Sequence, residues 1–268
     1  MFLTCHYYSR VLCRNVQINV IIPTPEGNEQ ITAQGKEQRY DYAKGLPVVY
    51  LLHGAYGDCS SWTRFSSIER YVQAHNCIAV MAGVENSFYQ DMKHGSPYFT
   101  YMTEELPAYI TSLFPASRRR EDTYIAGFSM GGYGAWYLAL SRPDLYSKAA
   151  SMSGALDIVR VYEGSTDGSI DNPFHWEDSF GETVFHLAGS DRDLMYLLKK
   201  DQESGQIPEL YQSCGDQDFL FEINRDVHER IEKMGIRTAY HEVPGHMHNW
   251  DFWDQDIRRI LDWMTADE

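Results

Sequence analysis

The chain has 268 residues, enough for one α/β domain that spans residues 1–268 and buries a sheet on both faces. Its net charge of −15 and isoelectric point near 5.0 argue against nucleic-acid or anionic-membrane partners, because polyanions would be repelled. Five cysteines without a Cys-x-x-Cys pair indicate reduced thiols. Without a leader-like N-terminus or a membrane-spanning stretch, we expect a cytoplasmic protein, and a homo-oligomer stays open.

The first part of the chain predicts three strands. Residues 3–8 and 15–22 are strand-like, the second with alternating apolar side chains, and together they predict an antiparallel edge. The polar segment 24–45 has no periodicity, so we expect a loop there, and its role stays open. Residues 46–52 form a continuous apolar run typical of a strand buried on both faces of a parallel sheet.

A glycine-containing stretch, His-Gly-Ala-Tyr-Gly at residues 53–57, follows this buried strand. Glycine lets the backbone approach a neighbouring group closely, as a site at the end of a strand requires. The alternative is an ordinary strand-ending turn. The choice depends on whether the chain also offers a nucleophile.

The next segments alternate between helix and strand. Residues 60–74 predict an amphipathic helix, residues 77–82 a buried strand, and residues 104–114 a second helix. Between them, residues 85–101 are polar and rich in aromatic side chains. This loop follows a strand, so it either lines a site at the sheet edge or packs as a surface loop.

The pattern G-x-S-x-G occurs within residues 123–135, at Gly127, Ser129 and Gly131. An apolar run precedes it and a helix-forming run follows, which is the strand–turn–helix context of a nucleophile elbow. Such a turn strains its central residue and brings the flanking positions too close together for a Cβ. We therefore predict that Ser129 is a catalytic nucleophile.

A serine nucleophile that attacks a carbonyl needs hydrogen-bond donors for the developing oxyanion. In the α/β hydrolases, one donor is the N–H after the nucleophile and the other comes from the loop after an earlier strand. Here these would be the N–H groups of Met130 and Ala55. The glycines at positions 54 and 57 suit this role of the loop.

Beyond the elbow, residues 147–154 predict another buried strand that ends in small side chains. Residues 155–182 then mix glycine, serine and aspartate with large aromatic residues. We expect either a cap or lid over the site or an insertion without regular structure.

The C-terminal part offers partners for the serine, which needs a base and a carboxylate that orients the base. A strand at 209–214 is followed by Asp216 and Asp218, and a strand at 237–243 is followed by His246 and His248. The order serine, aspartate, histidine is that of the α/β hydrolases, but spacing alone does not decide within either pair. No third ligand accompanies the two histidines, so we expect neither a metal nor a cofactor.

These motifs together resemble the esterase D-like (carbohydrate esterase family 1-like) branch of the α/β hydrolases, most closely the small bacterial tributyrin or acetyl esterases. The matching segments extend from the buried strand to the C-terminus: residues 51–54 with Trp62, 86–89, 104–107, 127–135, 214–220 and 248–253. The resemblance implies an α/β-hydrolase fold with a mostly parallel sheet. It also implies that Asp218 and His248, rather than Asp216 and His246, complete the triad.

The resemblance implies a serine carboxylesterase that hydrolyses short-chain acyl esters, acetyl or butyryl, through an acyl-serine intermediate. Its partner would be a small-molecule ester, with sugar esters included. A feruloyl or acetyl-xylan esterase is the first alternative. An S-formylglutathione thioesterase is the second, and it is less favoured because residues 52–57 lack the cysteine-containing L-S-G-L-T-C loop of that group.

Overall fold

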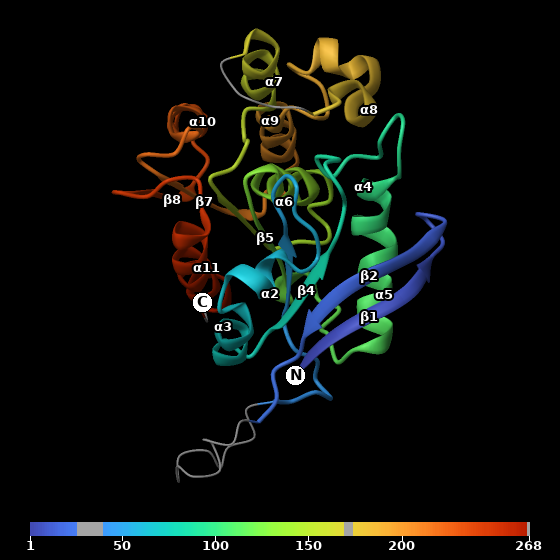
Figure 1. The fold of residues 1–268 in the computed structure, drawn as a ribbon. Helices are drawn as coiled ribbons and strands as arrows, with labels where there is room; N and C mark the ends of the chain where they lie inside the picture. Colours follow the sequence, from blue (N-terminus) through green and yellow to red (C-terminus); the bar gives the residue numbers. More distant parts are fainter. Residues whose placement is uncertain (26–39, 169–173, 267–268) are drawn as a thin grey trace.

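The computed structural model describes residues 1–25, 40–168 and 174–266 (Figure 1). Its strands form one sheet in the order β1-β2-β4-β3-β5-β6-β7-β8. From β4 to β8 in this order neighbouring strands are parallel, whereas β2 pairs antiparallel with both β1 and β4. The strands are β1 (Phe2–Ser9), β2 (Arg14–Ile21), β3 (Val48–Leu52), β4 (Ile78–Ala82), β5 (Thr123–Phe128), β6 (Lys148–Met152), β7 (Glu209–Gly215) and β8 (Thr238–Val243).

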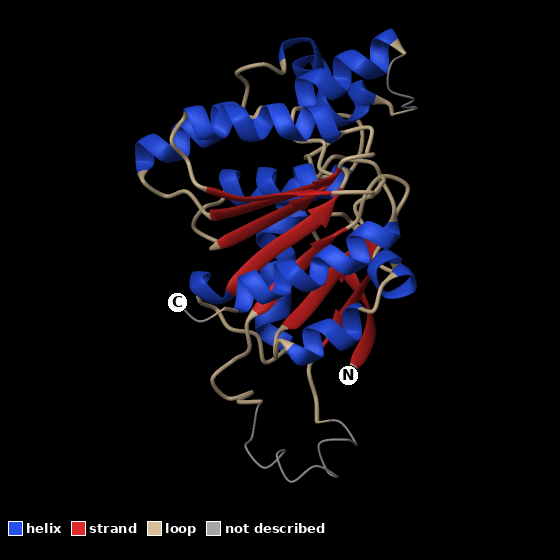
Figure 2. Ribbon diagram, turned by 90° about the vertical axis from the view of Figure 1, so that its left-hand side faces the viewer, coloured by secondary structure: helices blue, strands red, loops and turns tan. Residues whose placement is uncertain are grey.

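Helices cover both faces of this sheet, which confirms the predicted α/β-hydrolase architecture (Figure 2). No helix of the described ranges has both the length and the apolar composition that crossing a bilayer requires. The helical segments are α2 (Ser61–Phe65), α3 (Ile68–Ala74), α4 (Tyr98–Thr100), the π-helical η1 (Tyr101–Glu105), α5 (Leu106–Leu113), η2 (Arg120–Asp122), α6 (Met130–Ser141), α7 (Ile158–Asp167), α8 (Trp176–Phe180), η3 (Gly181–His186), α9 (Leu194–Ser204), α10 (Phe221–Lys233) and α11 (Trp250–Thr265).

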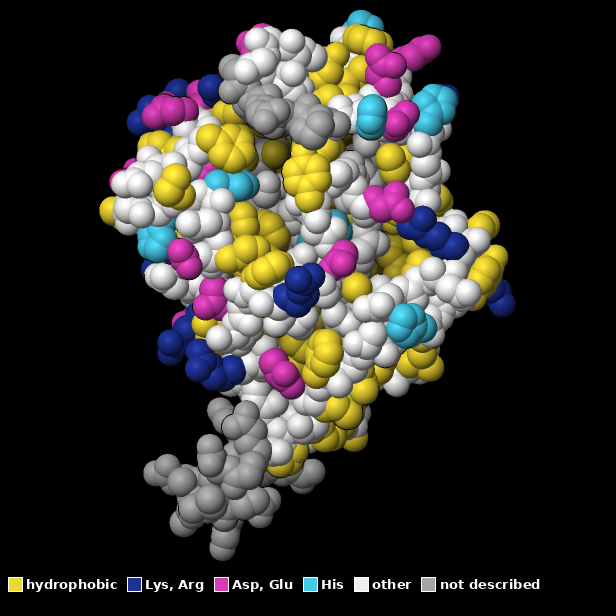
Figure 3. Space-filling view, in the orientation of Figure 1, with side chains coloured by type: hydrophobic (Ala, Val, Ile, Leu, Met, Phe, Trp, Pro, Cys, Tyr) yellow, Lys and Arg dark blue, Asp and Glu magenta, His cyan; other side chains and the backbone are white. Residues whose placement is uncertain are grey.

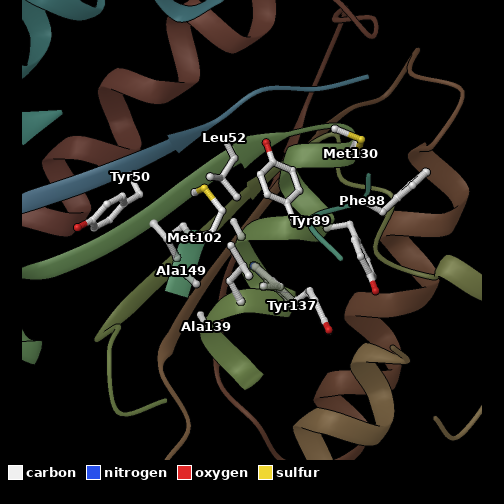
Figure 4. Packing of buried hydrophobic residues seen from close by; sticks show 14 of the residues in the cluster. Tyr50, Leu52, Phe88, Tyr89, Met102, Met130, Tyr137, Ala139 and Ala149 are labelled. Atoms are coloured by element: carbon white, nitrogen blue, oxygen red, sulfur yellow. The ribbon is translucent and has the colours of Figure 1, made fainter. Parts of the chain in front are cut away.

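The core lies in two layers because successive side chains of a strand point to opposite faces. In β3, Tyr50 and Leu52 join the layer beneath α5, α6, α9 and α10, part of which Figure 4 shows. Val49 and Leu51 join the layer beneath α2, α3 and α11. Burial on both faces is the reason that this strand is a continuous apolar run.

The structure corrects the helix predicted at 60–74. Two helices, α2 and α3, occupy this range, and the chain breaks between them at Ser66 and Ser67. The N–H of Ser67 donates to Oδ1 of Asp254 on α11 at 2.7 Å, and Ser66 Oγ donates to the Trp62 carbonyl. These bonds give the backbone an alternative to a continuous helix.

The structure describes little of one polar segment, 24–45, and most of the other, 155–182. Most of the predicted loop at 24–45 lies outside the described residues, since the structure does not describe 26–39. Within 155–182, the described residues form α7, α8 and the start of η3, so this part is helical rather than without regular structure. In Figure 1, α7 and α8 lie at the end of the sheet toward which the arrow of β5 points.

Candidate active site

Ser129 lies between β5 and α6 in a conformation that a side chain rarely adopts, with φ of 57° and ψ of −123°. A Cβ on Gly127 would come within 2.2 Å of the Gly131 carbonyl oxygen, and one on Gly131 within 2.6 Å of the His53 carbonyl oxygen. The Ser129 N–H donates to the Met152 carbonyl on β6 at 3.0 Å. The two glycines therefore allow the tight turn, and β6 fixes its position.

His248 and Asp218 form a hydrogen-bonded pair. The Nδ1 of His248 lies 2.8 Å and 3.0 Å from the two carboxylate oxygens of Asp218, whose side chain is fully buried. The carboxylate can only accept, so Nδ1 carries the proton and Nε2 is left to accept one. Asp218 also accepts from the Leu220 N–H at 2.9 Å, which fixes the carboxylate.

The duplicate residues of these two turns have other contacts. Asp216 is exposed and accepts from the N–H of Gly245 at 2.7 Å. The carbonyl of His246 accepts from the Gln217 N–H at 3.0 Å, and its ring lies against Phe252. Asp216 and His246 thus hold the turns after β7 and β8 against each other.

The predicted oxyanion donors both lie at Ser129. Met130 is the first residue of α6, and the first N–H groups of a helix have no acceptor within it. Ala55 lines the same cavity as Ser129 and Met130. A Cβ on the preceding Gly54 would lie 2.5 Å from the Phe128 ring and 3.2 Å from the Ser129 Cβ, so glycine lets this loop run against the nucleophile.

The buried His53 holds this loop in place. Its Nε2 accepts from the Val84 N–H at 3.0 Å, so Nδ1 carries the proton and donates to the Gly54 carbonyl at 2.7 Å. Burial lowers the pKa of His53, which favours this neutral form. Nearby, the N–H of Tyr56 donates to Oδ1 of Asn86 at 2.8 Å. The sequence predicted no such role for His53, because Val84 and Asn86 belong to the next strand–loop unit.

Of the two alternatives for the aromatic loop at 85–101, the structure supports the first, a place at the site. Phe88 lines the cavity beside Ser129. Tyr89 is buried and donates its hydroxyl hydrogen to the His53 carbonyl at 2.9 Å. Its ring packs directly on Gly134, where an added Cβ would lie only 2.2 Å from the ring. Tyr89 therefore supports the site from behind.

A cavity of about 500 Å³ joins these groups at the carboxyl ends of the strands. Ser129 and His248 both line it, and the rest of its wall divides into two kinds of side chain. Figure 3 shows hydrophobic side chains gathered near the middle of one face of the molecule, with acidic and basic side chains next to them. The apolar wall includes Phe88, Met130, Ala155, Val161, Phe174, Phe219 and Leu220, and the polar wall includes Asp58, Ser61 and Arg64.

In the described ranges, no three histidine, cysteine or carboxylate side chains lie close enough together to hold a metal ion. The cavity is lined instead by Ser129 and by His248, whose ring bonds to Asp218, with the predicted oxyanion donors Ala55 and Met130 beside them. This is the arrangement that acyl transfer to water uses.

Known proteins are similar to this chain in sequence and in fold. Residues 28–264 match the family model described as putative esterase. An acetyl esterase from Caldicellulosiruptor saccharolyticus is 32% identical over 264 residues, which cover 97% of this chain and 96% of the relative. Substrate-bound FphF, a fluorophosphonate-binding serine hydrolase of Staphylococcus aureus, is 30% identical with a TM-score of 0.86 and covers 100% and 99% of the two chains.

A second structure from Staphylococcus aureus, the apoenzyme of the S-formylglutathione hydrolase FrmB, is 30% identical with a TM-score of 0.82 and covers 99% of both chains. The similarities extend over nearly the whole chain and include the strand–turn–helix that carries Ser129. The chain therefore belongs to the putative esterase family and is a serine carboxylic ester hydrolase with the α/β-hydrolase fold.

Proposed function

We propose that Ser129, Asp218 and His248 form a catalytic triad that hydrolyses short-chain acyl esters. The observation that carries the proposal is the hydrogen bond between His248 and the buried carboxylate of Asp218, with His248 and Ser129 lining the same cavity. His248 Nε2 takes the Ser129 proton as the hydroxyl attacks the ester carbonyl, and Asp218 stabilises the imidazolium. His248 then protonates the leaving alcohol. In the second half, the same nitrogen takes a proton from a water molecule that attacks the acyl-serine carbonyl, and it returns this proton to Ser129 Oγ as the acid leaves.

In the same proposal, the N–H groups of Ala55 and Met130 bind the oxyanion of each tetrahedral intermediate. A preorganised donor of this kind contributes about 3 kcal/mol to lowering the barrier. The position of Met130 at the start of α6 adds the positive end of the helix dipole. The loop of Ala55 is held by His53, so this donor needs no rearrangement when substrate binds.

The acyl group would lie against the apolar wall of the cavity. Phe88 and Phe174 contact each other edge to face, with ring centroids 5.1 Å apart, and both line this wall. Large packed rings limit the room beyond the carbonyl, which favours acetyl and butyryl over long chains. The acetyl esterase relative supports the same substrate class.

One observation favours a second candidate, an S-formylglutathione-type thioesterase. The polar wall carries the guanidinium of Arg64, and glutathione carries two carboxylates that a cation would attract. The relative at 30% identity described as an S-formylglutathione hydrolase supports this candidate. A feruloyl or acetyl-xylan ester would instead use the exposed rings of Tyr56 and Phe65 at the cavity.

A substrate panel tests these candidates. We expect kcat/KM to be highest for acetyl and butyryl nitrophenyl esters, lower for octanoyl, and lower still for feruloylated sugars and S-formylglutathione. Ser129→Ala measured on the same panel is the control for contaminating esterases. A preference for the thioester or the feruloyl ester would replace the proposed substrate class and keep the triad. Near-normal turnover by Ser129→Ala would refute the triad.

A further inference from the structure

Strand β1 is the edge of the sheet, and no strand of the described residues pairs with its outer side (Figure 1). Met1 and Ile22 exchange both backbone hydrogen bonds, at 2.6 Å and 2.9 Å. Hydrogen-bonded and non-hydrogen-bonded pairs alternate along an antiparallel ladder. With Phe2 opposite Ile21, the N–H and C=O groups of the even-numbered residues of β1 therefore point outward, away from β2.

This edge lacks the features by which proteins prevent strands from pairing. Such features are charged side chains, proline, a bulge or a very short strand. β1 has eight residues in regular register with β2, and it contains no Lys, Arg, Asp, Glu or Pro. In a chain with a net charge of −15, it is a stretch where two copies can meet without placing like charges opposite each other.

We propose that a second copy of this chain binds here, with the two β1 strands antiparallel about a two-fold axis at Cys5. In this register the outward-pointing residues pair as Phe2 with Tyr8 of the second copy and Thr4 with His6 of the second copy. A shift by two residues in either direction leaves an outward residue of each strand without a partner. The proposed register is therefore the one in which all of these backbone groups are bonded.

The side chains support the same register. Phe2 is 43% exposed and Tyr8 is 59% exposed, at opposite ends of one face of β1. Antiparallel pairing about Cys5 brings each of these rings across the strand from the other, and cross-strand aromatic pairs stabilise sheets. Two exposed aromatic side chains on each copy are thereby covered.

The opposite face of β1 packs against α5, which fixes the position of the strand. Tyr7 stacks on Tyr109 of α5 with ring centroids 3.9 Å apart, and its hydroxyl bonds to that of Tyr101 at 2.9 Å. Leu113, one helical turn after Tyr109 and on the same side of α5, is 59% exposed. The strand is held flat against this helix, and none of its residues lines the cavity at Ser129.

The first test is the oligomeric state by sedimentation velocity. We expect the wild-type protein to sediment as a dimer and Thr4→Pro as a monomer. Proline removes an N–H that points outward, so the ladder between β1 and β2 keeps its bonds. His6→Glu, which places a carboxylate within the strand edge of each copy, should also dissociate the dimer. Unchanged esterase activity per chain shows that the variants are folded, because β1 lies outside the active site.

The second test uses Cys5, which faces its own copy across the proposed axis. Residues at a non-hydrogen-bonded antiparallel position have Cα atoms about 4.5 Å apart, close enough for a disulfide. In a Cys13→Ser background, mild oxidation by copper phenanthroline should join two chains through Cys5, with the oxidant taking two electrons and two protons released. Thr4→Pro should abolish the product. Leu3→Cys in a chain without Cys5 and Cys13 should form none, because position 3 faces position 7.

Three outcomes would overturn the proposal. One is a wild-type protein that sediments as a monomer. Another is a dimer that survives both Thr4→Pro and His6→Glu, which would place the interface elsewhere. The third is a dimer that crosslinks through position 3 and not through Cys5, which would contradict the register.

Discussion

The position of Ser129 depends on the absence of a Cβ at Gly127 and Gly131. A Cβ on Gly127 would meet the backbone oxygen of Gly131 at 2.2 Å, and backbone, unlike the end of a flexible side chain, cannot rotate away. The strained φ of Ser129 persists because β6 bonds the Ser129 N–H and the loop after β3 packs against Gly131. A backbone shift that makes room for a Cβ at Gly127 would therefore also move Ser129.

We therefore expect Gly127→Ala to lower kcat/KM by about 100-fold or more, since a displacement of about 1 Å of a catalytic group has this effect. Thermal unfolding should shift to lower temperature as well. The matched control is Gly83→Ala, where an added Cβ would have only ordinary contacts at 3.7 Å and beyond. Equal kinetics for the two variants would contradict the steric account of the elbow.

The two aspartates after β7 make different contacts, and their substitutions should differ accordingly. We expect Asp218→Asn to lower kcat by about 10⁴-fold, because an amide no longer stabilises the imidazolium and favours the wrong tautomer. Asp216→Asn keeps an oxygen to accept the Gly245 N–H and should change kcat by less than about threefold. Steady-state kinetics on a butyrate ester checks both, and the reverse ranking would exclude Asp218 from the triad.

At the scale of elements, sequence patterns predicted the parts whose signals are local. The strands β1 to β8 and the elbow follow from apolar runs, glycines and turn residues that lie within a few positions of one another. The break between α2 and α3 could not be predicted in this way, because the acceptor for the Ser67 N–H is Asp254, which lies 187 residues later. The contacts of His53 were missed for the same reason.

Phe174 shows how a residue outside the sheet shapes the cavity. Phe174 precedes α8, stacks on Tyr56 with centroids 5.6 Å apart at 21°, and contacts Phe88 edge to face. Asp157 caps α7 by accepting from the Arg160 N–H. The ring of Phe174 therefore joins the chain before α8 to the loop beside the proposed oxyanion hole.

We expect Phe174→Ala to shift the preference toward longer acyl chains, because the removed ring enlarges the apolar wall. The ratio of kcat/KM for octanoyl to acetyl esters should rise by about tenfold. Phe185→Ala is the control, because that ring belongs to η3, is 60% exposed and does not line the cavity. An unchanged chain-length profile would show that Phe174 does not bound the acyl site.

At the scale of the whole molecule, the sheet order assembles the site. The turns that carry Ser129, Asp218 and His248 follow β5, β7 and β8, and these strands are parallel in one sheet. Parallel strands put their carboxyl ends at one edge, so the chain order of the motifs was sufficient to predict their convergence. The choice of Asp218 over Asp216 and of His248 over His246 came from the family resemblance, because the sequence spacing does not show which carboxylate contacts which imidazole.

A buried carboxylate on α9 affects the stability of the whole fold. Burial raises the pKa of Asp201 from 3.8 to about 6, and its Oδ2 has no hydrogen-bond partner among the described residues. Between these values the folded protein binds more protons than the unfolded chain, so Asp201 makes the free energy of unfolding fall as pH rises. Above about pH 6 the full cost of the buried charge is present.

We expect Asp201→Asn to raise the free energy of unfolding at pH 7.5 by an amount on the order of 1 kcal/mol, and to leave it nearly unchanged at pH 3.5. Urea unfolding at the two pH values measures the difference. Glu203→Gln on the same helix, an exposed position, should show no such pH dependence. A stabilisation by Asp201→Asn that is equal at both pH values would show that the buried charge is not its source.

The hydrogen bonds of His53 have a consequence for protein engineering. This imidazole joins the loop after β3 to the start of the loop after β4, and Asn86 and Tyr89 of the latter bond back to the former. The conformation of each loop thus depends on the other. Grafting the loop of a relative after β3 alone would leave the Val84 N–H or the Tyr89 hydroxyl facing a mismatched partner. Substrate range in this scaffold should therefore be transferred between relatives only when both loops move together.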